Sequence, residues 1–155
     1  MRTALARSMA WTSLVLAGAC AVPITLPSEF VELRDAGDGF RAVTADDARL
    51  RVRDLADPTA GDLGFWIATL RNDLVQQRGY ELVASGDVKD GAGQDGKWLQ
   101  FAANVQGERV GFLVAVWLRR SFFGGPSLRV VEFAGREPAF GERLGAVRSA
   151  LATTR

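Results

Sequence analysis

The sequence predicts an α+β domain: an antiparallel sheet of about six to seven strands, with a long middle helix and a C-terminal helix packed on it. Three observations predict this class. Short runs that alternate polar and apolar residues are separated by turn-forming residues, which is typical of hairpin-linked strands. The run 110–118 is apolar at every position. Two segments, 57–79 and 138–152, instead space their apolar residues at helical intervals. Strands with helices inserted between and after them favour a sheet covered by helices.

The first predicted strands are short. Residues 30–34 and 40–44 are joined by a turn that contains Gly37 and Gly39. Residues 49–53 alternate arginine with an apolar residue, which is typical of a strand with one solvent-exposed face.

The middle helix has recognisable end signals. Asp57 can cap its start, Pro58 suits the first turn, and Gly79 suits the position just past the end. Between them one apolar stripe is formed by Leu63, Trp66, Ile67, Leu70 and Leu74. A helix with one apolar stripe is expected to lie on a sheet.

Four further strands and a closing helix follow. A glycine- and aspartate-rich loop is expected at 86–96. The strands are predicted at 80–85, 98–105, 110–118 and 128–133, and the helix at 138–152. Because a strand that is apolar on both faces needs cover on both, we expect 110–118 to be central in the sheet and the two helices to lie on opposite faces.

The amino-terminal segment has the organisation of a secretory signal. Arg2 and Arg7 precede an uncharged run, 8–19, which ends in small residues directly before Cys20, the only cysteine. This segment resembles a bacterial lipoprotein signal, and the resemblance implies cleavage before Cys20 and fatty acylation of that residue. An ordinary signal peptide, with Cys20 incidental, is the alternative. A membrane-spanning helix is disfavoured, because about 20 apolar residues are needed to cross.

The lipoprotein interpretation divides the chain into three parts. Residues 1–19 are the signal peptide, 20–28 the lipidated cysteine with an extended tether, and 29–155 a single domain. The implied location is the periplasmic side of the cell envelope, attached to a membrane through Cys20. Ala21 after the cysteine favours the outer membrane where one exists.

Composition excludes several functions. The chain has no histidine, which removes Ser–His–Asp and Cys–His catalysis and histidine-ligated zinc. The leader holds two of the 19 basic residues and none of the 18 acids, so the exported part is close to neutral. Nucleic acid is therefore not an expected partner, and no cofactor or metal is predicted.

The order of elements resembles a known family. Small amino-terminal strands, a long helix, a four-strand meander and a closing passage VVEFAGREPAFGERLGAVRSAL are similar to PsbP-like domains, whose relatives include Mog-type Ran-binding proteins and DcrB-like lipoproteins. The resemblance covers roughly 29–155 and implies a protein that acts by binding. No functional residue of that family carries over, because no site motif matches.

One surface segment is a candidate for partner binding. Arg119, Arg120, Phe122 and Phe123 place two cations beside two aromatics in a glycine-rich loop, and such residues are enriched at interface cores. The alternative is that both phenylalanines fold back over the sheet edge. An unknown envelope protein is the expected partner.

The acids form no convincing catalytic or metal motif. Asp87, Asp90 and Asp95 could offer oxygens to calcium, but their spacing does not match an EF-hand, and a flexible turn between two strands is the preferred explanation of the same composition. No catalytic residue is predicted.

Three functions follow in order of preference. The first is a lipid-anchored, non-enzymatic binding or adaptor domain. The second is a small carrier with a cavity between sheet and helix, lined by Trp66, Trp98 or Trp117. The third, a histidine-free hydrolase, requires at least two acids that converge in one cleft.

Overall fold

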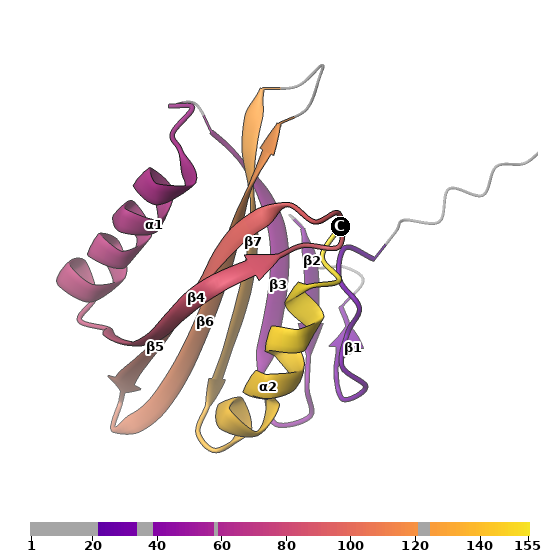
Figure 1. Ribbon diagram of the computed structural model, residues 1–155. Coiled ribbons are helices and arrows are strands. Elements are labelled where there is room, and N and C mark those ends of the chain that lie inside the picture. Colours follow the sequence, from indigo (N-terminus) through magenta and orange to yellow (C-terminus); the bar gives the residue numbers. More distant parts are fainter. Residues whose placement is uncertain (1–21, 34–38, 58, 121–124) are drawn as a thin grey trace, which may run out of the picture.

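The predicted α+β class is confirmed. The computed structural model describes residues 22–33, 39–57, 59–120 and 125–155. Within them, seven antiparallel strands form one sheet in the order β1-β2-β3-β7-β6-β5-β4 (Figure 1). The strands are β1 (Val31–Glu32), β2 (Phe40–Val43), β3 (Arg49–Ala56), β4 (Glu81–Lys89), β5 (Asp95–Val105), β6 (Glu108–Arg120) and β7 (Pro126–Arg136). The helices are α1 (Leu63–Asn72), which continues into a π-helical segment η1 (Asp73–Gln77), and α2 (Ala139–Leu151).

Strand β6 lies in the interior of the sheet, as its continuous apolar run predicts. It pairs with β5 on one side and with β7 on the other. Successive side chains of a strand point to opposite faces. Leu113, Ala115 and Trp117 therefore enter the core on one face, while Val114 and Val116 enter a second core on the other.

The two helices cover opposite faces of the sheet, as expected (Figure 1). Helix α2 packs closely, burying Phe140 and Val147 against β6 and β7. The approach is so close that a Cβ atom on Gly111 would lie 2.0 Å from the Phe140 ring. Neither helix in the described part of the chain has the length and apolar character that a bilayer crossing requires.

The segment expected to be an extended tether is partly packed into the domain. Ile24 is 1% exposed and belongs to the core under α2. The Thr25 backbone N–H donates to Thr153 Oγ1 at 2.8 Å, and the Arg155 N–H donates to the Pro23 carbonyl at 2.9 Å. The folded body therefore begins near Pro23 rather than near Glu29.

Two local predictions were wrong. Helix α1 begins at Leu63, where the Asp62 carboxylate caps it by accepting from the Phe65 N–H at 2.7 Å, so Asp57 is not its cap. The predicted loop 86–96 is largely strand, because β4 runs to Lys89 and β5 begins at Asp95.

Candidate functional site

Helix α1 covers its face of the sheet less closely than α2 covers the other. No residue of α1 is fully buried, whereas α2 buries four. The predicted stripe does face the sheet: Leu63, Trp66, Ile67 and Leu70 pack partly against the second core, and Leu74 of η1 is fully buried. The helix is thus held to the sheet mainly at its carboxyl end.

An apolar groove, the α1 groove, lies between α1 and the sheet and has a volume of about 260 Å³. Its apolar walls are formed by Val114 and Val116 of β6, Leu128 and Val130 of β7, and Trp66 and Leu70 of α1. The pairing of β6 with β7 explains how the two strands form one wall of the groove. Val116 lies opposite Val130, and Val114 opposite Glu132, so the inward-facing residues of both strands share one face.

The charged groups that line the α1 groove are already paired. Arg53 of β3 contacts Glu132 of β7 at 2.9 Å, with both side chains partly buried. Asp73 contacts Arg78 at 2.9 Å. The groove therefore offers an apolar surface without an uncompensated charge.

Asp57 fastens the amino-terminal end of α1 to the sheet. The residue is only 3% exposed. Its carboxylate accepts hydrogen bonds from Trp66 Nε1 at 3.2 Å, Thr59 Oγ1 at 3.0 Å and the Gly61 N–H at 3.4 Å. Burial alone would raise the pKa of Asp57, but the hydrogen bonds from Trp66, Thr59 and Gly61 together hold it below its usual value. Asp57 is therefore ionised at neutral pH and fixes the ring that lines the groove.

A second cavity, the tip cavity, continues along the same strands and has a volume of about 400 Å³. It is lined by Asp57, Ala60, Gly61, Leu118, Arg119, Arg120 and Pro126. Leu118 and Arg120 follow Val116 at two-residue steps on β6, so they lie on the groove face. Asp57 lines the tip cavity and accepts a hydrogen bond from Trp66 of the α1 groove, so one contact links the linings of the two hollows.

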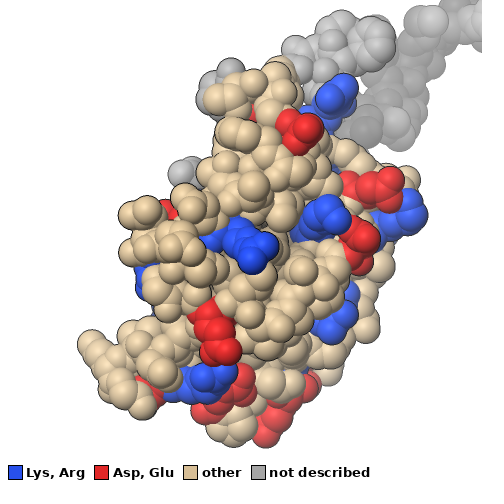
Figure 2. Space-filling view, turned by 60° about the vertical axis from the view of Figure 1, so that its left-hand side comes forward, with Lys and Arg blue, Asp and Glu red and all other residues tan. Residues whose placement is uncertain are grey.

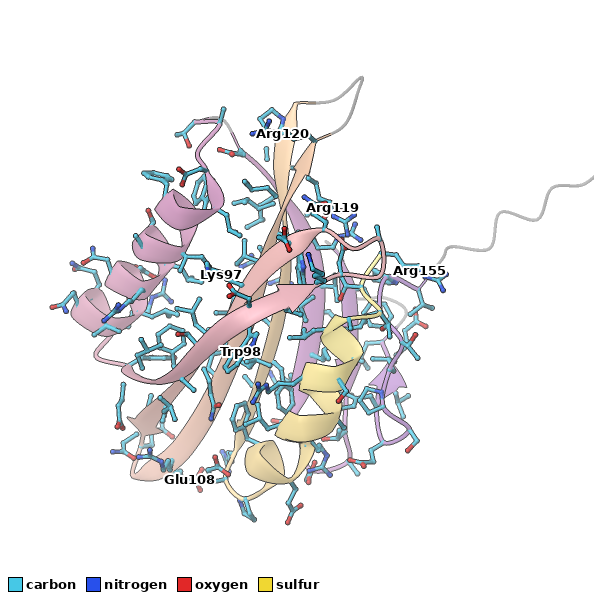
Figure 3. All side chains as sticks on the ribbon, in the orientation of Figure 1. Lys97, Trp98, Glu108, Arg119, Arg120 and Arg155 are labelled. Atoms are coloured by element: carbon cyan, nitrogen blue, oxygen red, sulfur yellow. The ribbon has the colours of Figure 1, made fainter. Side chains whose placement is uncertain are left out.

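The structure describes only part of the predicted partner-binding segment. Arg119 contacts the fully buried carboxylate of Asp90 at 3.1 Å, which ties it to the β4–β5 turn. Arg120 is exposed at the end of β6 and has no acidic partner among the described residues (Figure 3). Phe122, Phe123 and Cys20, the predicted lipidation site, lie outside the described residues, so their roles remain predictions.

The aspartates considered for calcium are engaged within the β4–β5 hairpin. Asp87 contacts Lys97 at 2.5 Å, and Asp95 pairs with Lys89. Asp90 accepts from the N–H groups of Ala92 and Gln94 at 2.9 and 2.8 Å. Within the described ranges, no three acidic or cysteine side chains gather in a way that could hold a metal ion.

Of the three tryptophans proposed to line a cavity between sheet and helix, Trp66 alone lines the α1 groove. Trp98 and Trp117 are buried on the opposite face. The Arg148 guanidinium lies 4.0 Å from the centre of the Trp98 ring in a cation–π contact, and both residues line a hollow of about 350 Å³ beside α2. Because Asp87, Arg148 and Ser149 also line that hollow, the α1 groove is the more apolar of the two and the better candidate for an apolar ligand.

The side of the molecule that carries α1 has mixed charge. Figure 2 shows basic and acidic residues interspersed among the other residues, without a continuous region of one sign on that face. This pattern gives no electrostatic surface for a polyanion.

Comparison with known proteins shows the fold. No protein-family model matches the chain, and no curated protein matches it. Among solved structures, LpqN of Mycobacterium tuberculosis, described as involved in cell envelope biogenesis, matches with a TM-score of 0.65 at 11% identity, over 83% of this chain and 78% of that one.

Two other structures share the architecture. A Pseudomonas aeruginosa protein of unknown function, PA94, described as a putative regulator, has a TM-score of 0.60 at 14% identity, over 81% of this chain and 80% of that one. The Saccharomyces cerevisiae Ran-binding protein Mog1p has a TM-score of 0.52 at 12% identity, over 78% and 75%. The likeness to Mog1p agrees with the predicted Mog-type fold.

Proposed function

We propose that this chain is a lipid-anchored, non-enzymatic binding domain of the cell envelope that holds an apolar ligand in the α1 groove. The observation that carries the proposal is the groove itself, an apolar surface between α1 and β6–β7 whose charged lining residues are paired with one another or with a neighbour. Apolar surface gains about 25 cal/mol per Å² when it is removed from water, so such a groove favours an apolar occupant.

The size of the groove limits the ligand. Pockets for drug-sized ligands have volumes of roughly 300–1,000 Å³, and the α1 groove lies just below this range at about 260 Å³. It suits a small apolar molecule, or one apolar arm of a larger molecule whose remainder occupies the tip cavity.

Two observations support the envelope location. The segment before Cys20 has the basic start, apolar run and small-residue end of an exported lipoprotein. LpqN, which shares the fold, is described as a protein of cell envelope biogenesis. On this proposal Cys20 carries the lipid and the domain is exported, with the outer membrane favoured where one is present.

The groove is tested with N-phenyl-1-naphthylamine, a neutral probe that fluoresces in apolar surroundings. Thr69 is an exposed residue of α1 that lines the groove, so Thr69→Phe would fill the groove without disturbing a core residue. We expect the variant to bind the probe about tenfold more weakly, equal to about 1.4 kcal/mol.

A matched control is Ala68→Phe, because Ala68 is also exposed on α1 but lines a hollow on its other side. This variant should bind like the unmodified protein. Equal probe binding by both variants would contradict the proposed site.

The anchor is tested in cells supplied with a labelled fatty acid. Cys20→Ala should accumulate as unprocessed precursor without label, whereas the unmodified protein is labelled. Intact-mass analysis that finds a bare thiol at Cys20 would contradict the anchor and leave the groove result unaffected.

A further inference from the structure

The beginning of the folded body lies at one end of the sheet. Pro23 and Thr25 are held by hydrogen bonds to Arg155 and Thr153, as described above. The Gly91 N–H in turn donates to the Thr154 carbonyl at 2.8 Å. The first residues of the body, the last residues of the described chain and the β4–β5 turn therefore meet.

The same end carries part of the lining of the tip cavity, Arg119 and Arg120. The Asp90–Arg119 contact places the β4–β5 turn beside the end of β6. The Asp57 N–H donates to the Pro126 carbonyl at 2.9 Å, which brings the end of β3 to the start of β7. We call this end, formed by residues 22–25, 90–94, 119–120 and 153–155, the anchor end. Figure 3 shows Arg119, Arg120 and Arg155 toward it and Glu108 at the opposite end.

Very little chain separates the proposed lipid from this end. Cys20 is three residues before Pro23. Three extended residues span at most about 11 Å between Cα atoms. By contrast, β6 has 13 residues and extends over roughly 40 Å from one end of the sheet to the other. A link this short keeps the beginning of the folded body close to the surface into which the lipid inserts, whereas the opposite end of the body can lie much farther away.

We infer that the anchor end lies against the lipid bilayer, so that the tip cavity opens toward the membrane and the α1 groove leads away from it. This inference rests on the proposed lipidation of Cys20. The short link, and not a charged surface, is the basis for this orientation. An apolar ligand would then pass between the bilayer and the groove along the Leu118 and Pro126 side of the tip cavity.

The test measures which end of the protein lies near lipid headgroups. Because lipid occupies the sulfur of Cys20, the only natural cysteine, a second cysteine can be labelled selectively with a fluorophore. Ala92→Cys places the label in the β4–β5 turn at the anchor end. Ala45→Cys places it at the opposite end, in the turn before β3. Both alanines are exposed.

The lipidated full chain is reconstituted into vesicles of phosphatidylethanolamine and phosphatidylglycerol that contain a headgroup nitroxide lipid, which quenches nearby fluorophores. We expect strong quenching at position 92 and little at position 45. Equal quenching at both positions, or stronger quenching at 45, would overturn the inferred orientation.

Lengthening the link separates its effect from direct attraction to the bilayer. Twenty Gly/Ser residues inserted between Ala21 and Val22 have a root-mean-square length of roughly 25 Å. The insertion should reduce the quenching at position 92 toward that at 45, while the protein stays on the vesicles. Unchanged quenching would show that the short link does not set the orientation. Failure of the proposed lipidation would look different, because the protein would not float with the vesicles at all.

Discussion

The indole Nε1 of Trp66 donates a hydrogen bond to the buried carboxylate of Asp57, nine residues earlier, at 3.2 Å. This bond connects the amino-terminal half of α1 to the residue that follows β3. It matters because no residue of α1 is fully buried. It fixes the one tryptophan that lines the α1 groove, so the shape of the groove depends on a polar contact at its margin.

We predict that Asp57→Ala loosens the amino-terminal half of α1. The substitution leaves Trp66 Nε1, Thr59 and the Gly61 N–H without their acceptor. Hydrogen exchange should accelerate across residues 59–70, and the melting temperature should fall by a few degrees. Asp62→Ala is the control, because it removes only the N-cap, at a cost of about 1 kcal/mol. If both variants exchange alike, Asp57 does not hold the helix.

We predict that Asp57 also contributes to acid sensitivity. Its pKa in the folded protein lies below the usual value of 3.8, because its hydrogen bonds outweigh the effect of burial. The folded protein therefore binds this proton less readily than the unfolded chain does. The contribution of Asp57 to stability is fully present above pH 3.8, and it is lost as the pH falls through the pKa that Asp57 has in the folded protein. Between about pH 5 and about pH 2.5, the melting temperature of the unmodified protein should fall further than that of Asp57→Asn. Parallel curves would assign the acid sensitivity to other carboxylates.

Two glycine substitutions should have opposite effects on stability. At Gly111 a new methyl group would meet the Phe140 ring, so Gly111→Ala should destabilise the protein by about 1–3 kcal/mol. Gly145 lies in α2 with open space around its Cα, so Gly145→Ala should stabilise it by about 0.5–1 kcal/mol. Chemical denaturation measures both. A neutral Gly111→Ala would mean that α2 can move away from β6 at little cost.

We predict that the Asp90–Arg119 pair is structurally important while a neighbouring ion pair is not. The Asp90 side chain is fully buried, so Asp90→Ala leaves Arg119 and two turn N–H groups unpartnered and should cost about 3 kcal/mol. Asp95→Ala in the same hairpin removes an exposed pair with Lys89 and should cost less than about 1 kcal/mol. Similar losses in urea denaturation would contradict the difference in burial.

The sequence was informative wherever a pattern extended over several residues. The continuous apolar run of β6 predicted an interior strand, and the helical stripe from Leu63 to Leu74 predicted the face of α1 that meets the sheet. The start of α1 was harder to predict, because Asp57 and Asp62 both have a side chain that can cap a helix. Only the position of Trp66 in space assigns Asp57 to the indole.

Other features depend on contacts between residues that are distant in sequence. The sequence predicts Ile24 to be part of a proline-rich tether. Only its contact with the core under α2 shows that it belongs to the domain. The α1 groove could not be predicted, since its width depends on how far α1 lies from the sheet. Its chemical signal was present nonetheless, as Val114, Val116, Leu128 and Val130 in two neighbouring strands.

The hydrogen bond between Pro23 and Arg155 has a practical use in protein engineering. Because these two residues are neighbours in space, a linker of a few residues would join them into a continuous chain. New ends could then be opened at Gly107, in the exposed β5–β6 turn. Such a circular permutant would keep every strand pairing of the described sheet while moving the two chain ends to the opposite end of the body.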